Sequence, residues 1–137
     1  MTAAVFLESS PDMSREVVVD RADVRNASTT YLRAGYHISL DDLMHLLLIG
    51  SDNAAARVLA RVSPWGSAGF ISRMNQKALE LGLASTSYAD PSGLLADNVS
   101  SAYDLARLIS FVSGDPRISG IMQTPSYTVK ANQHPIT

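Results

Sequence analysis

The stretch GYHISLDDLMHLLLIGSDNAAARVLA, residues 35–60, predicts two consecutive helices joined by a polar corner. Ser39 can cap the first helix, and Asp42 stands three residues later in the capping-box position. The apolar residues that follow are spaced three or four positions apart and so fall on one helical face: Leu40, Leu43, Met44 and Leu47. The stretch therefore predicts an amphipathic helix whose apolar face packs into a core.

The corner between these two helices is the tripeptide Ser51-Asp52-Asn53, which follows Gly50. A hydroxyl and an amide two residues apart on one turn can relay a proton and can both donate and accept hydrogen bonds. On its own, such a tripeptide is more often a plain helix cap than a catalytic feature. Its meaning therefore depends on the rest of the chain.

The remainder of the chain predicts a mixed α+β fold that is predominantly helical. Helical patterns cover residues 2–8, 67–81, 101–112 and 118–122, and strand-like patterns cover residues 16–20, 29–32 and 127–130. The helix that opens at Ser101 is expected to bury one face, made of Leu105, Leu108, Ile109 and Val112. Residues 85–98 are a predicted loop. The first helical pattern starts without a capping residue, which suggests that the chain is cut from a longer protein.

Composition limits the classes of function that are possible. With 46% hydrophobic and 18% charged residues, the 137-residue chain is expected to fold as one globular domain. The net charge is -2 and no run of Lys or Arg occurs, so we expect no nucleic-acid partner. We recognise no signal peptide and no apolar run of the ~20 residues that a membrane span needs. The three histidines lack metal-ligand spacing, so we expect no metal, and His45 is expected at a helix surface.

Several segments together resemble the penicillin-binding, serine-type D-alanyl-D-alanine carboxypeptidase family. They are residues 35–60, MNQKALELGL at 74–83, YADPSGL at 88–94 and SSAYDLARLI at 100–109, in the family's order and spacing. The resemblance covers nearly the whole chain. It implies that residues 1–137 are a partial domain, the helical subdomain of the penicillin-binding protein/β-lactamase-like transpeptidase fold, with an incomplete antiparallel sheet.

The resemblance also implies roles for individual residues. Ser51 would shuttle a proton between an activating lysine and the leaving amine, and Asn53 would hydrogen-bond the peptide group of the substrate. Asp52 would cap the following helix, while Ser92 and Gly93 would border the substrate cleft. The implied partner of the full-length relative is a peptidoglycan stem peptide or a β-lactam. The chemistry needs no cofactor, and such enzymes act in the periplasm or elsewhere outside the cytoplasmic membrane.

Two motifs of the family are missing from this sequence. Neither lysine, Lys77 or Lys130, ends a Ser-x-x-Lys motif, because Met74 and Tyr127 stand three positions earlier. Neither begins Lys-Thr-Gly. By family spacing the nucleophile would lie just before the first residue, and the substrate-clamping strand beyond the last. We therefore expect that this chain alone neither hydrolyses D-Ala-D-Ala peptides nor binds penicillin covalently.

Alternatives to a carboxypeptidase fragment remain open. One is a non-catalytic module of the same fold that binds peptidoglycan peptide or a protein. Another is a fragment related to a class A β-lactamase, ranked lower because residues 85–98 contain no glutamate that could serve as the deacylating base. Without the strands that cover the helices in the family, we expect a bare apolar helix face and association into a homo-oligomer or strand-exchanged dimer.

Overall fold

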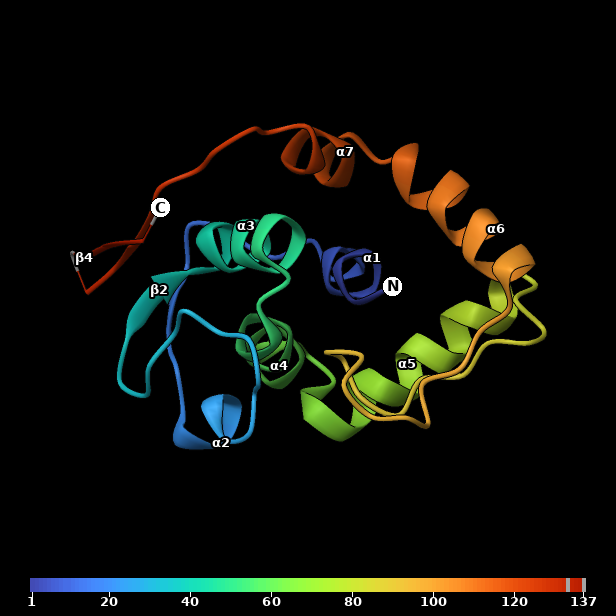
Figure 1. The fold of residues 1–137 in the computed structure, drawn as a ribbon, viewed down its shortest axis with the longest axis horizontal. Helices are drawn as coiled ribbons and strands as arrows, with labels where there is room; N and C mark the ends of the chain where they lie inside the picture. The colour runs from blue at the N-terminus through green and yellow to red at the C-terminus, as the bar shows by residue number, and fades with distance from the viewer. Residues whose placement is uncertain (133, 137) are drawn as a thin grey trace.

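The computed structural model describes residues 1–132 and 134–136, which form a predominantly helical fold with two short antiparallel strand pairs. The elements, in order, are α1 Thr2–Glu8, β1 Glu16–Val18, α2 Arg21–Val24, β2 His37–Ser39, α3 Leu40–Gly50, α4 Asn53–Val62, α5 Gly66–Glu80, α6 Ala102–Ser113, α7 Pro116–Met122, β3 Val129–Ala131 and β4 His134–Ile136 (Figure 1). The expectation of a mixed, mainly helical α+β fold is confirmed. No helix of this described part is long and apolar enough to cross a membrane.

The core lies where α1, α3, α4 and α5 meet, near the middle of Figure 1. α1 is buried on almost every side, from Thr2 to Leu7. The largest fully buried side chains around it come from neighbouring helices: Leu40, Leu43, Met44, Leu59 and Phe70. The transfer of each such side chain from water into the core stabilises the folded state by about 1.5–3 kcal/mol. Of the face predicted for residues 40–47, Leu40, Leu43 and Met44 are buried, and Leu47 is partly buried against the core.

The strand pair near the N-terminus differs from the prediction. β1 pairs with β2, with Val17 opposite Ile38, and residues 29–32 form no strand. Asn26 and Ser28, just before that segment, have positive φ angles of 53° and 61°. Such angles turn the chain away from the extended conformation. Residues 26–32 therefore form an irregular loop, whose backbone is left free to contact another part of the fold.

The buried face predicted for α6 is wrong in part. Leu108 is buried, but Leu105 is 46% and Ile109 61% exposed. Leu108 packs in a small cluster with Ala78 and Leu83, separate from the main core. Figure 1 shows α6 at the periphery, away from α3 and α4. Helical spacing identified the apolar side of α6, but the described part of the fold covers only a narrow strip of it.

Candidate active site at the corner between two helices

The candidate corner begins with Ser51, which ends α3 in the left-handed conformation at φ 49° and ψ 40°. Residues other than glycine adopt this region infrequently. Ser51 is exposed, and its hydroxyl has no hydrogen-bond partner among the described residues. The hydroxyl is therefore accessible to a ligand.

Asp52 anchors the corner from inside the protein. Its side chain is fully buried, and one carboxylate oxygen accepts a hydrogen bond from the Ala55 N–H at 2.9 Å, which caps α4. The other oxygen accepts from the Tyr31 N–H at 2.7 Å and from the Thr30 hydroxyl at 3.0 Å. A buried carboxylate is tolerated only when it is hydrogen-bonded in this way. The predicted cap is confirmed, but the link to the loop of residues 26–32 was not foreseen.

Asn53 is tied to the same loop. Its backbone N–H donates to the Thr29 carbonyl at 3.1 Å, and its side-chain Nδ2 donates to the Ala27 carbonyl at 2.8 Å. Because a carbonyl only accepts, these contacts fix which end of the amide faces the loop. The amide oxygen has no partner among the described residues. Asn53 can thus still accept a hydrogen bond from a ligand.

Ser92 and Gly93 line a hollow of about 290 Å³. Its walls also include the start of α1, from Met1 to Ala3, and Leu47 and Leu48 of α3, in the turn before Ser51. Neither Ser51 nor Asn53 lines this hollow. The structure therefore brings Ser92 and Gly93 to the start of α1, but it does not gather all four predicted site residues around one hollow.

Asp90 organises the loop that carries Ser92 and Gly93. Its carboxylate accepts from the backbone N–H of Ser92 at 2.6 Å, of Gly93 at 2.6 Å and of Leu95 at 2.7 Å. It also accepts from the Ser92 hydroxyl and from Asn98. Burial alone would raise the pKa of Asp90, but these hydrogen bonds outweigh it and lower the pKa to about 2. Sequence reasoning missed Asp90, although an aspartate before Pro-Ser-Gly is a known turn signal.

A second hollow is lined by His45, Gly50 and Tyr127, and here the expectation for His45 is wrong. The His45 side chain is only 12% exposed, and its ring stacks on Tyr127 with the centroids 3.6 Å apart. The chain after α7 folds back over α3 and covers this histidine, which the local pattern could not indicate. Burial, aided by the charges of Asp42 and Asp41, raises the pKa of Tyr127 to about 12.

A family model described as D-alanyl-D-alanine carboxypeptidase matches residues 1–136. The chain belongs to this family. It is 36% identical to a D-alanyl-D-alanine endopeptidase of Pseudomonas aeruginosa over 137 residues, which cover 98% of this chain and 44% of the relative. It is 34% identical to a D-alanyl-D-alanine endopeptidase of Escherichia coli over 140 residues, which cover 94% of this chain and 45% of the relative.

Two solved structures have the same fold as this chain. A D-alanyl-D-alanine carboxypeptidase of Mycobacterium tuberculosis superposes with a TM-score of 0.88 at 29% identity, covering 98% of this chain and 52% of that one. The Streptomyces K15 DD-transpeptidase superposes with a TM-score of 0.86 at 26% identity, covering 95% of this chain and 55% of that one. The expected fold class is confirmed. The chain spans less than half the length of the curated relatives quoted above.

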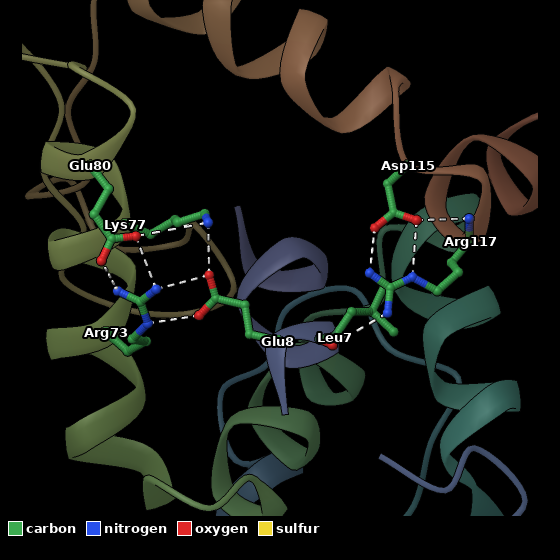
Figure 2. A network of polar contacts seen from close by, with 7 residues as sticks. All are labelled: Leu7, Glu8, Arg73, Lys77, Glu80, Asp115 and Arg117. Carbon is green, nitrogen blue, oxygen red and sulfur yellow. Dashed lines mark hydrogen bonds and ion pairs between the residues drawn. The ribbon is translucent and has the colours of Figure 1, made fainter. Parts of the chain in front are cut away.

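In this carboxypeptidase-family chain, Lys77 is held in an ion cluster at the C-terminal end of α1 (Figure 2). Glu8 accepts from Arg73 at 2.7 Å and from Lys77 at 2.9 Å, and Glu80 also pairs with Arg73 at 2.7 Å. The Lys77 ammonium lies 5.0 Å from the centre of the Phe111 ring. Lys77 therefore fastens α5 to α1. Within residues 1–132, no group of three or more His, Asp or Glu side chains gathers to hold a metal ion.

Proposed function

We propose that this chain supplies the Ser-x-Asn part of the catalytic site of a serine-type D-Ala-D-Ala peptidase that acts on peptidoglycan stem peptides. The observation that carries the proposal is the Ser51 hydroxyl, which is exposed and unpaired within the described residues. Asp52, buried beneath it, holds the corner in place. The match of the family model to residues 1–136 supports the same substrate class.

The proposed reaction is acyl transfer. A serine attacks the D-Ala-D-Ala carbonyl, the D-alanine amine leaves with a proton, and water then hydrolyses the ester. Ser51 would carry that proton from the activating lysine to the leaving amine. Asn53 would accept a hydrogen bond from the substrate with its free amide oxygen. We place this reaction outside the cytoplasmic membrane, where peptidoglycan lies, and regard residues 1–137 as part of one transpeptidase-like domain.

We also propose that the chain alone is inactive. Its sequence contains no Ser-x-x-Lys motif, so Ser51 has no lysine-activated nucleophile to serve. The test is incubation of the chain with a fluorescent penicillin, followed by mass spectrometry. We expect no acylated serine. A stable adduct on Ser51 or any other serine would contradict the proposed inactivity.

Binding can be tested without chemistry. Diacetyl-L-Lys-D-Ala-D-Ala is titrated into the ¹⁵N-labelled chain, and amide shifts are followed by NMR. We expect shifts at Ser51 and Asn53, and weaker binding in Ser51→Ala. The matched control is Ser110→Ala, which removes an exposed hydroxyl on α6. Equal affinities of the two variants, with no shifts at the corner, would argue against the proposed function.

A further inference from the structure

The loop wall, which residues 91–93 form in the hollow at the start of α1, has no hydrogen-bond donor available to a ligand. Pro91 carries no N–H. The backbone N–H of Ser92 and of Gly93 both donate to Asp90, each at 2.6 Å. The Ser92 hydroxyl lies 2.7 Å from the same carboxylate oxygen. Every N–H and O–H group of residues 91–93 is therefore already engaged inside the loop.

The direction of the hydroxyl bonds follows from their partners. The pKa of Asp90 is lowered to about 2, because the hydrogen bonds to it outweigh the opposing effect of burial. The carboxylate is thus ionised at neutral pH and can only accept, so the Ser92 hydroxyl must be the donor. Thr2 donates its hydroxyl to the Pro91 carbonyl at 2.6 Å, which also can only accept. Both hydroxyl protons point into the protein framework, and the oxygen lone pairs remain.

We infer that Ser92 acts as an obligate hydrogen-bond acceptor in this hollow and selects a ligand group that carries an N–H. A carboxylate or another oxyanion finds no donor on this wall and meets the negative charge of Asp90. The inference rests on the proposed function and deepens it, because it orients the bound stem peptide with an N–H, and not its terminal carboxylate, toward Ser92. The N–H can belong to a peptide amide or to a diamino-acid ammonium.

The test compares ligands that differ by one N–H. At pH 7.5, the whole chain is titrated with diacetyl-L-Lys-D-Ala-D-Ala and with two analogues, each with one peptide amide replaced by an ester. A fourth ligand has a free lysine ε-ammonium. A recognised N–H is worth about a 3- to 10-fold difference in Kd, as expected for one hydrogen bond. If Ser92 accepts from a peptide amide, we expect wild type to bind one ester analogue more weakly by this factor. If Ser92 accepts from the lysine ammonium, we expect wild type to bind the free-amine peptide more tightly.

Ser92→Ala supplies the decisive comparison. It removes the acceptor but leaves Asp90 its contacts with the Ser92, Gly93 and Leu95 backbone, so the loop keeps its shape. We expect this variant to lose the discrimination between the N–H ligand and its analogue, and Ser92→Thr to restore it. A purely structural role would weaken all ligands equally.

Three results would overturn the inference. The first is that Ser92→Ala discriminates between the ligands as wild type does, and the second is that all four ligands bind wild type equally. The third is competition between acetate and the peptide at Ser92. In each case, shifts at Ser51 that depend on the peptide would leave the proposed function standing. No binding of any peptide to wild type would overturn both.

Discussion

Replacement of Asp52 with asparagine tests whether one buried carboxylate holds the candidate corner in place. The carboxylate accepts from the Ala55 N–H at 2.9 Å, the Tyr31 N–H at 2.7 Å and the Thr30 hydroxyl at 3.0 Å. An asparagine side chain has one acceptor oxygen and one NH₂ group. It can keep the cap of α4 or the contact with Tyr31, but the other backbone N–H then faces a donor.

The expected loss follows from that geometry. A buried donor left without an acceptor costs about 1–3 kcal/mol, and a hydrogen bond to a charged group contributes about 1.5–3 kcal/mol. Both figures describe the loss of the same hydrogen bond, so they do not add. The Thr30 hydroxyl can rotate and accept instead, so it adds little. We expect Asp52→Asn to lower the free energy of unfolding by about 2–3 kcal/mol, out of a typical total of about 5–15 kcal/mol.

The assay is urea unfolding, followed by circular dichroism and by the fluorescence of Trp65, the one tryptophan. With a slope of about 1–3 kcal/mol per molar urea, the midpoint should fall by about 0.7–3 M at an unchanged slope. Asp97→Asn makes the same chemical change at an exposed position and serves as the control. If the two variants unfold within about 0.5 kcal/mol of each other, the range of ordinary surface substitutions, Asp52 does not anchor the corner.

Three other perturbations have defined outcomes. The pKa of Asp90 is lowered from 3.8 to about 2, so the contribution of its carboxylate to stability is full above about pH 4 and is lost as pH falls through 2. Asp90→Asn should therefore flatten the dependence of Tm on pH between 2 and 4. An unchanged slope in the variant would refute this. Glu8→Gln leaves Arg73 and Lys77 facing a neutral amide, so we expect the free energy of unfolding, measured in urea, to fall by about 1–2 kcal/mol. The difference from wild type should be smaller in high salt. The exposed apolar face of α6 should drive self-association, so Ile109→Lys should lower the mass seen by light scattering at high concentration; a monomeric wild type would contradict it.

The sequence alone determined the longer helices and several of their caps, because these depend on neighbours three or four positions away, whereas the short α2 with its Asp20 cap was not predicted. Ser39 and Ser101 were predicted to open helices, and both side chains accept from the backbone three residues later, at 3.0 and 3.1 Å. The Asp52 cap of α4 is of the same kind. The motif segments, read together, also identified the family, since order and spacing along the chain are properties of the sequence itself.

Only the tertiary structure decided what those helices touch. Tyr127 lies 86 positions from Asp41, whose carboxylate its hydroxyl contacts at 3.2 Å, and it covers a histidine that the helical pattern placed at the surface. Asp52 reaches back to Tyr31, and Thr2 reaches forward to Pro91, 89 positions away. The exposure of Leu105 and Ile109 has the same origin. A local pattern shows which side of a helix is apolar, whereas its coverage depends on distant chain segments that the folding of the whole brings together.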